Sequence, residues 1–209
     1  IIDNTLIIFT SDNGPWLNFG NHAGSTGGLR EGKGTSFEGG QRVPTVMMWP
    51  DIIPAGKIAN QLSSAIDILP TVSHIVDGNL PKHKIDGINI MEILKGEKVN
   101  PRKEFYYYYG NNNLEAVRKD NWKLILPHNS RSYKGVLPNN DGFPGNYNSI
   151  TTGLELYNLR RDPGEEYDVI KKYPNIAKEL EELAEKARSD MGDNLTGRKG
   201  INNRTHGKL

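Results

Sequence analysis

The chain opens on an apolar run that predicts a buried strand. Leu6 to Phe9 are all apolar, and polar Ser11-Asp12-Asn13-Gly14 follows shortly after. A continuous apolar run of this length is typical of a strand that is covered on both faces. We therefore expect Asp12 and Asn13 at the C-terminal end of a strand, which is where ligands bind in open α/β sheets.

A long glycine-rich segment separates this strand from the next one. Residues 14–44 show neither a helical nor a strand period, and Val43 to Trp49 then form a second apolar run that ends at Pro50. Structureless loops longer than about 12–15 residues are usually functional or disordered. The segment therefore calls for a functional explanation.

Two helices and a boundary are predicted next. Ser63 to Val76 carries apolar residues at helical spacing, with Pro70 placed near the first turn, and a short helix is expected over Ile88 to Leu94. The composition shifts around Lys95-Gly96-Glu97. We predict a division there, into domains 1–96 and 97–209.

The second domain is predicted to be small and α+β. Its strand-like runs are separated by turn residues, as in an antiparallel meander, and a further strand and an amphipathic helix follow. The runs are Phe105–Tyr109, Leu114–Lys119, Trp122–Leu126 and Leu154–Leu159, and the helix is Asn175–Met191, with Pro174 in its first turn. The tail from Gly192 to Leu209 is expected to be irregular.

Composition narrows the functional classes. The 209 residues have a formal net charge of +1, and their scattered basic residues form no extended basic stretch, so we expect no nucleic-acid partner. No apolar run approaches the roughly 20 residues that cross a bilayer, so no membrane partner is expected. The chain has no cysteine, so it can supply no disulfide, thiolate ligand or cysteine nucleophile. The chain starts without Met and runs directly into a predicted strand, so we expect a truncated or processed chain. The sequence predicts no oligomeric state.

Asp12 and Asn13 are candidate metal ligands. They place a carboxylate and an amide oxygen side by side, which suits a hard cation such as Ca²⁺ or Mg²⁺. Neighbouring strand residues point to opposite faces, so both can reach one ion only if the chain turns, and Gly14-Pro15 can supply that turn. The alternative is that these four residues form an ordinary turn.

Lys33 is a candidate anion contact. It lies between Gly32 and Gly34, and an ammonium in a glycine loop is a compact cation for sulfate or phosphate. The spacing is not that of a P-loop. The alternative is a solvated surface lysine.

Other polar residues carry weaker signals. His22 could donate a proton or a hydrogen bond at neutral pH, although a lone loop histidine is more often simply exposed. Glu38 and Arg42 flank Gly39-Gly40, and we expect them to form a structural salt bridge at the exit of the loop.

Several motifs follow one another along the chain. They are Ser11-Asp12-Asn13-Gly14-Pro15-Trp16, Gly28-Leu29-Arg30-Glu31-Gly32-Lys33-Gly34-Thr35, Phe37-Glu38-Gly39-Gly40-Gln41-Arg42-Val43-Pro44, Trp49-Pro50, Ser64-Ala65-Ile66-Asp67-Ile68-Leu69-Pro70-Thr71, Asp86-Gly87 and Leu156-Tyr157-Asn158-Leu159-Arg160-Arg161-Asp162-Pro163-Gly164-Glu165. Read in this order, they resemble the C-terminal half of the sulfatase family, and the resemblance runs from Thr5 to about Gly200.

The resemblance implies a fold and a site. The fold is α/β, an alkaline-phosphatase-like mixed sheet with flanking helices, followed by a small α+β subdomain with an antiparallel sheet and a packed helix. Asp12 and Asn13 would be ligands of Ca²⁺ or Mg²⁺, Lys33 would contact the sulfate, and His22 would lie at a substrate contact. The substrate would be a sulfate ester, and bacterial relatives suggest an exported or periplasmic protein.

The resemblance also implies what this chain lacks. Sulfatases use a formylglycine made from Cys or Ser in a C/S-x-P-x-R motif, and nothing in these 209 residues matches it. We therefore expect the nucleophile in a missing N-terminal half and no turnover by this fragment alone. Two alternatives stay open: a phosphohydrolase or phosphodiesterase of the same superfamily, and a non-catalytic C-terminal interaction domain.

Overall fold

The computed structural model describes residues 1–204, which divide into two compact units. Unit 1 comprises Ile1–Asp12 and Val43–Lys103, and unit 2 comprises Asn13–Arg42 and the chain from Glu104 onward. The domain boundary after Gly96 stays a prediction. The compact units divide after Lys103 and group the glycine-rich segment with the C-terminal half.

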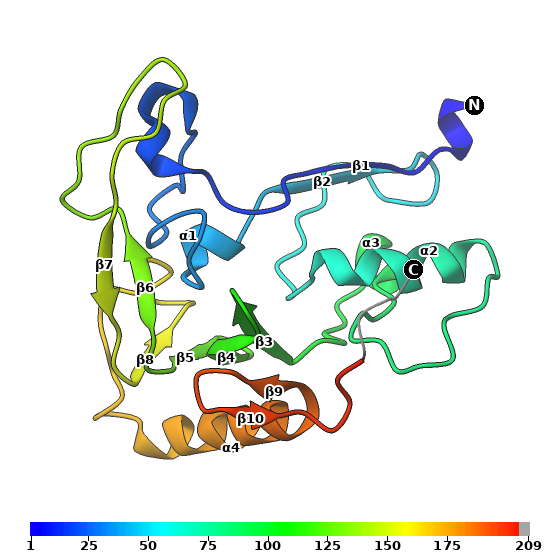
Figure 1. Ribbon diagram of the computed structural model, residues 1–209. Helices are drawn as coiled ribbons and strands as arrows, with labels where there is room; N and C mark the ends of the chain where they lie inside the picture. The colour runs from blue at the N-terminus through cyan, green and yellow to red at the C-terminus, as the bar shows by residue number, and fades with distance from the viewer. Residues whose placement is uncertain (205–209) are drawn as a thin grey trace, which may run out of the picture. The chain divides into compact units, whose positions relative to one another are not determined.

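Unit 1 contains the two predicted strands and the two predicted helices. After a short 3-10 helix η1 (Ile2–Asn4), strand β1 (Ile7–Thr10) pairs antiparallel with β2 (Thr45–Met48), as Figure 1 shows. The first predicted helix consists of a 3-10 turn η3 (Ala65–Asp67) that continues into α2 (Ile68–Ile75), and the second is the single turn α3 (Met91–Leu94).

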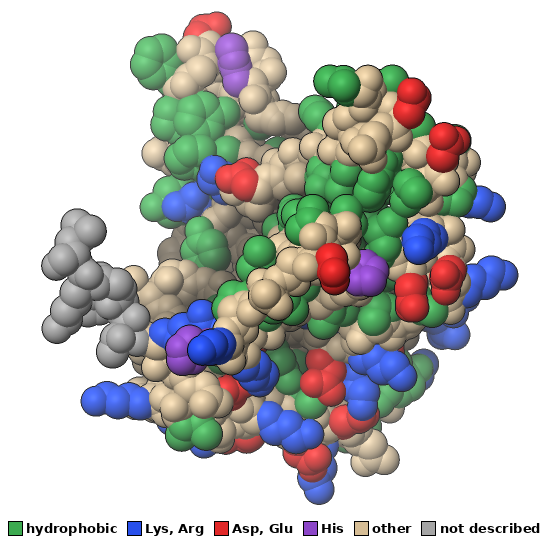
Figure 2. Space-filling view, turned by 90° about the vertical axis from the view of Figure 1, so that its right-hand side faces the viewer, with side chains coloured by type: hydrophobic (Ala, Val, Ile, Leu, Met, Phe, Trp, Pro, Cys, Tyr) green, Lys and Arg blue, Asp and Glu red, His purple; other side chains and the backbone are tan. Residues whose placement is uncertain are grey.

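The prediction that the first strand is buried is wrong for this chain. Four large side chains of the two strands are exposed, Ile7 by 40%, Phe9 by 73%, Val46 by 63% and Met48 by 43%, and the alternate residues Ile8 and Met47 are only partly buried. Within residues 1–204, β2 is the only strand that pairs with β1. An apolar run indicates that a strand is suited to burial, but the strand is buried only where other elements cover both of its faces. Figure 2 shows groups of exposed hydrophobic side chains on the side of α2 and α3.

Asp67 organises the helical part of unit 1. Its side chain is fully buried, and it forms a capping box with Ser64 at the start of the helix. Its carboxylate also accepts hydrogen bonds from the Ile88 N–H and the Arg102 guanidinium. Pro70 lies in the first turn of α2, where a missing N–H leaves no helical hydrogen bond unmade.

Unit 2 is built on the predicted antiparallel meander. Strands β3 (Glu104–Tyr109), β4 (Asn113–Lys119), β5 (Trp122–Ile125) and β8 (Glu155–Asn158) form one sheet in the order β3-β4-β5-β8. Helix α4 (Pro174–Met191) begins with its proline at the first position, as predicted, and lies along one face of the sheet (Figure 1). The core on this face consists of Leu114, Val117, Leu124, Leu126, Leu156, Ala177, Leu180, Leu183, Ala184 and Ala187.

The glycine-rich segment covers the opposite face of the same sheet. It forms a 3-10 helix η2 (Leu17–His22) and a single helical turn α1 (Glu38–Gln41), and is otherwise irregular, as predicted. Phe37, just before α1, is fully buried against sheet residues. This second core consists of Phe37, Tyr107, Ala116, Ile125, Tyr157 and Leu159. The sheet therefore carries the predicted site segment on the face that α4 leaves open.

Two hairpins complete unit 2. Strands β6 (Asn129–Ser132) and β7 (Asn148–Thr151) pair antiparallel, within a stretch where no strand was predicted. The prediction of an irregular tail is wrong over its first residues, since β9 (Gly192–Asp193) pairs with β10 (Arg198–Lys199). The reason is tertiary: Asp193 is buried and accepts the N–H of Leu114 from the main sheet. Residues 205–209 of that tail lie outside the described part.

Among residues 1–204, no helix combines the length and the apolarity needed to cross a membrane.

Candidate active site

Asp12 and Asn13 follow directly after β1, as the sequence predicts. Asp12 is exposed and Asn13 is partly buried. Asp12 ends the first stretch of unit 1, and Asn13, His22 and Lys33 all belong to unit 2. Three of the four predicted site residues therefore belong to one compact unit. Asp12 belongs to the other unit and directly precedes Asn13 in the chain.

Backbone crossings hold the segment around Lys33. The Gly14 N–H donates to the Gly40 carbonyl at 2.9 Å, and the Lys33 N–H donates to the Pro15 carbonyl at 2.9 Å. The Gly39 N–H donates to the Arg30 carbonyl at 2.8 Å. A Cβ on Gly14 would lie 1.8 Å from the Gly39 oxygen, so no larger residue fits this crossing. The glycines therefore serve to bring backbone against backbone.

Lys33 has a partly apolar environment and a fixed main chain. Its ammonium lies 5.5 Å from the centroid of the Trp16 ring, within cation–π range. Its carbonyl accepts a 2.6 Å hydrogen bond from the hydroxyl of Tyr133, the residue that follows β6. Within residues 1–204, no carboxylate lies within ion-pair distance of this ammonium. Its charge is therefore available to an anionic ligand.

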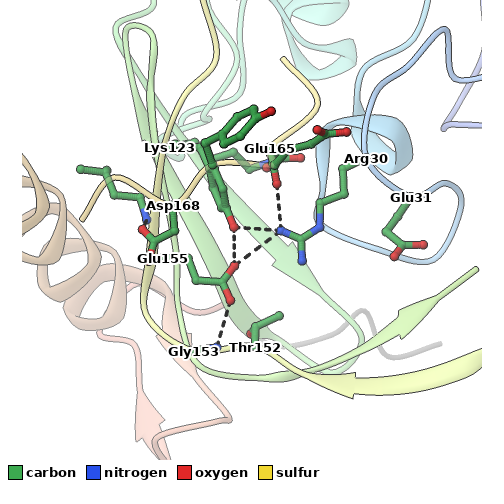
Figure 3. Close-up of polar contacts among 12 residues, drawn as sticks. Arg30, Glu31, Lys123, Thr152, Gly153, Glu155, Glu165 and Asp168 are labelled. Carbon is green, nitrogen blue, oxygen red and sulfur yellow. Dashed lines mark hydrogen bonds and ion pairs between the residues drawn. The ribbon is translucent and has the colours of Figure 1, made fainter. Parts of the chain in front are cut away.

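Glu31 connects the Lys33 loop to the β6–β7 hairpin. Its carboxylate accepts hydrogen bonds from the Ser132 hydroxyl at 2.5 Å and from the Tyr133 N–H at 2.7 Å. In Figure 3 it points away from the contacts of the neighbouring Arg30. Glu31 has a positive φ of 57°, a conformation that non-glycine residues rarely adopt. We infer that its two hydrogen bonds hold this turn and place Tyr133 over the Lys33 carbonyl.

The Tyr133 contact yields a first prediction. Tyr133→Phe removes the hydroxyl and leaves the Lys33 carbonyl without that donor, so the free energy of unfolding should fall by about 1 kcal/mol in urea titrations. Tyr167→Phe is the matched control, because this tyrosine is 70% exposed. Equal stability of the Tyr133→Phe and Tyr167→Phe proteins would show that the hydrogen bond contributes nothing.

A buried charge cluster fixes the other end of the loop. Lys123, on β5, shares a strand face with Ile125 and is fully buried. Its ammonium lies 3.1 Å from the Glu38 carboxylate and 2.9 Å from that of Glu165, and it donates to the Ser36 carbonyl at 2.8 Å. Glu165 in turn accepts the N–H of Glu38 at 2.6 Å. Ion pairing therefore attaches α1 to the sheet.

Burial and pairing compete in the pKa values of this cluster. Burial alone would raise the pKa of Glu38, but Lys123 and Arg118 outweigh it and the pKa is lowered. For Glu165 burial prevails over Lys123, so its pKa is raised. Burial would lower the pKa of Lys123, but Glu165 and Glu38 outweigh it and raise that pKa. The two carboxylates thus balance the charges of Lys123 and the nearby Arg118, 3.8 Å from Glu38.

The predicted salt bridge between Glu38 and Arg42 is wrong. Glu38 is buried and pairs with Lys123 and Arg118, whereas Arg42 is exposed. Sequence proximity suggested Arg42, but α1 turns the Glu38 side chain toward the sheet. Arg30 is likewise fixed by unit 2, over the Phe37 ring at 3.8 Å and in hydrogen bonds with Tyr157 and the Glu165 carbonyl (Figure 3).

The remaining predicted site residue, His22, lies at the end of η2 and is exposed. Its role stays a prediction. Sequence reasoning gave no role to Lys123, Glu165, Tyr133 or Arg131, which surround the loop in the structure. Glu165 is the last residue of the sulfatase-like motif that contains Asp162-Pro163-Gly164, and that position could have drawn attention to it. Nothing in the sequence marks Lys123, Tyr133 or Arg131.

The donor chemistry of Asp12 and Asn13 fits a hard divalent cation. They offer a carboxylate and an amide oxygen, and the exposed Asp12 is accessible. Within residues 1–204, no group of three or more His, Cys, Asp or Glu side chains could hold a metal ion. Because Ca²⁺ takes about 6–8 oxygen ligands, these two residues could supply only part of a coordination shell.

Sequence comparisons identify the family. Residues 2–78 match the family described as Sulfatase, and residues 100–205 match the one described as C-terminal region of aryl-sulfatase. This chain belongs to the sulfatase family. It is 31% identical to arylsulfatase A of Bos taurus over 183 residues, which cover 86% of this chain and 36% of that protein. It is 35% identical to N-acetylgalactosamine-6-sulfatase of Mus musculus over 179 residues, 80% of this chain and 34% of that protein.

A solved sulfatase has the same fold. The crystal structure of the PsFucS1 sulfatase from Pseudoalteromonas sp. superimposes with a TM-score of 0.72 at 27% identity, covering 88% of this chain and 37% of that one. The predicted alkaline-phosphatase-like fold class is confirmed. The sulfatase chain spans about a third of the length of the curated relatives it matches.

Proposed function

We propose that the protein carrying this chain is a sulfuric ester hydrolase of the arylsulfatase type. The observation that carries the proposal is Lys33, an ammonium without a carboxylate partner in the described part, held on a rigid backbone crossing in a member of the sulfatase family. A cation that the fold places in advance stabilises the negative charge that develops in a transition state, and here the hydrogen bonds of the Lys33 main chain set where its side chain begins. Lys33 would offset the charge that builds on the ester oxygen as the S–O bond breaks.

Asp12 and Asn13 would hold a divalent cation, Ca²⁺ or Mg²⁺. Such a cation supplies Lewis-acid polarisation of the sulfate oxygens when it is bound. His22 would be a substrate contact, as the family resemblance implies, and it is exposed at the end of η2. The nucleophile, formylglycine by the family resemblance, would come from outside these 209 residues, so we expect the isolated chain not to turn over.

The exposed strands of unit 1 support the same proposal. β1 and β2 present apolar side chains that nothing in residues 1–204 covers. A strand pair of this kind is suited to burial inside a larger α/β sheet. We propose that the rest of a sulfatase catalytic domain covers these faces in the active protein, which would be exported.

The test is hydrolysis of nitrophenyl sulfate by the intact protein, with nitrophenyl phosphate measured in parallel. Lys33→Ala should lower kcat by roughly 10²–10³, the scale of one lost transition-state donor, and leave the folding transition unchanged. Lys171→Ala, which changes an exposed lysine on another segment, is the control.

Three results would contradict the proposal. An unchanged rate for Lys33→Ala would make this lysine a surface residue. Preference for the phosphate ester would favour the phosphohydrolase alternative. Absence of hydrolysis of either ester by the intact protein would favour a non-catalytic interaction domain.

A further inference from the structure

Arg131, on β6, is a second cation beside the Lys33 loop. Its guanidinium donates to the Tyr133 hydroxyl at 3.3 Å, and its central carbon lies 4.1 Å from the centroid of the Tyr147 ring. Within residues 1–204 no carboxylate lies within ion-pair distance of it. A partly buried arginine normally has an anionic partner or a strong acceptor. Its remaining donors are therefore available to an anionic ligand.

The structure fixes Arg131 next to Lys33. A Cβ built on Gly34, the residue after Lys33, would lie 2.9 Å from the Arg131 Nη1 atom. Arg131 donates to the Tyr133 hydroxyl, which in turn donates to the Lys33 carbonyl at 2.6 Å. Hydrogen bonds in such a chain polarise and strengthen one another. Two hydrogen bonds through Tyr133 thus connect the Arg131 guanidinium to the Lys33 main chain, although the two segments are about a hundred residues apart in the sequence.

Two aromatic rings accompany these cations: Trp16, before η2, lies by Lys33, and Tyr147, in the loop between β6 and β7, lies by Arg131. Asn18, on η2, anchors the loop between β6 and β7: the Asn18 side-chain amide donates to the Gly145 carbonyl at 2.6 Å, and the Asn18 carbonyl accepts the N–H of Asn139 at 3.0 Å. Trp16 and Tyr147 remain 39% and 52% exposed. Both rings already carry a cation, Lys33 over Trp16 and Arg131 over Tyr147, and each remains partly accessible to a ligand.

We propose that Arg131 binds a second anionic group of the substrate, a sulfate or carboxylate beside the ester that Lys33 contacts. The inference rests on the proposed sulfatase function and specifies its substrate. A planar guanidinium recognises sulfate and carboxylate through paired N–H donors, which a lysine cannot do. With Lys33 on the scissile sulfate, Arg131 selects for a neighbouring negative charge on the same substrate.

The experiment compares substrates in the intact protein and in the Arg131→Gln variant. The substrates are nitrophenyl sulfate and three 6-O-sulfated disaccharides, whose second sugar is neutral, sulfated or a uronate. For the two doubly charged disaccharides we expect KM to rise by about tenfold or more, the scale of one lost charge-assisted hydrogen bond. Nitrophenyl sulfate and the neutral disaccharide should change less than about twofold. The larger loss, on the sulfated or the uronate sugar, identifies the second anion.

Controls separate this inference from the proposed function. Arg160→Gln changes an exposed arginine elsewhere in unit 2 and should leave every KM unchanged. Arg131→Lys keeps the charge without the fork and should recover part of the selectivity, which also guards against a folding defect in Arg131→Gln. Calorimetric binding of the doubly charged disaccharides measures Arg131 directly, whether or not the protein hydrolyses them.

The outcomes are distinct. If the wild-type protein hydrolyses no sulfate ester, the proposed function fails, and calorimetry still decides on Arg131. A loss of affinity confined to doubly charged ligands supports the inference. An equal loss on all four substrates would make Arg131 a purely structural residue, and no loss on any of them would also overturn the inference.

Discussion

Lys123→Met is expected to lower the free energy of unfolding by about 3–5 kcal/mol, the scale of a broken buried ion pair. Methionine fills much of the same volume but leaves Glu165 buried without its cation and Glu38 with only Arg118. It also removes the donor to the Ser36 carbonyl and the cation that lies 4.3 Å from the Tyr107 ring. Chemical unfolding of the wild-type and variant proteins measures the difference.

Two further variants separate lost charge balance from lost packing. Lys119→Met removes a lysine from a solvent-exposed pair with Glu179, so it should leave the free energy of unfolding nearly unchanged. Lys123→Met/Glu165→Gln removes one buried charge of each sign and leaves Glu38 with Arg118, so a large part of the stability should return. A double variant no more stable than Lys123→Met would mean that the cluster acts through packing and that charge balance contributes little.

The pH dependence of the defect has a definite sign. The pKa of Lys123 is raised, so its contribution is complete below the ordinary lysine pKa and is lost only as pH rises through the folded value. The pKa of Glu38 is lowered, so its contribution is lost as pH falls below its ordinary 4.5. The pKa of Glu165 is raised, so its effect on the pH dependence of stability has the opposite sign to that of Glu38. The folded protein binds the Glu165 proton more readily than the unfolded protein does. In Lys123→Met the unpaired carboxylates can take up protons, so the defect should shrink as pH falls from about 7 toward about 5.

Asp12→Ala should reduce hydrolysis of nitrophenyl sulfate by the intact protein by roughly 10³-fold or more, because a ligand of the proposed cation is lost. The same variant should lose the rise in Tm that Ca²⁺ gives the wild-type protein. A ligand present at about 100 times its Kd stabilises the folded state by about 2.7 kcal/mol, which is readily measured. Activity and metal response should thus disappear together.

Two variants serve as references for Asp12. Asp3→Ala removes an exposed carboxylate from η1 and should keep both the activity and the Ca²⁺ response. Lys33→Ala should lose turnover and keep the Ca²⁺ response, because Lys33 is proposed to contact the substrate and not the ion. Full activity of Asp12→Ala would refute the metal assignment.

The elements were largely predictable because their signals are local. The α4 pattern, with a proline at the start and apolar residues on one stripe, and the meander of β3, β4 and β5 both follow from short-range periodicity. The order of the site motifs likewise pointed to the sulfatase family, which the comparisons confirm. The roles of Asp12, Asn13, Lys33 and His22 stay predictions, and the proposed variants test those of Asp12 and Lys33.

The contacts around the site were not predictable, for a physical reason. Lys123 alternates with apolar residues along β5, a pattern that places it on a solvent face, yet Phe37 and Glu38 cover that face. Whether a polar residue is buried depends on which distant segment packs over it, and no periodicity encodes that. The same holds for Tyr133 and Arg131, whose contacts with Lys33 and Gly34 span about a hundred residues.

The sequence by itself determined the main helices and strands of this sulfatase chain and its family, and it named candidates for chemistry, because propensity, periodicity and motif order are properties of short segments. Only the tertiary structure decided what holds those residues. It replaced the expected Glu38–Arg42 bridge by a buried cluster around Lys123, and it showed that β1 is exposed. Burial and ion pairing are set by segments distant in the chain, and these meet only when the chain folds.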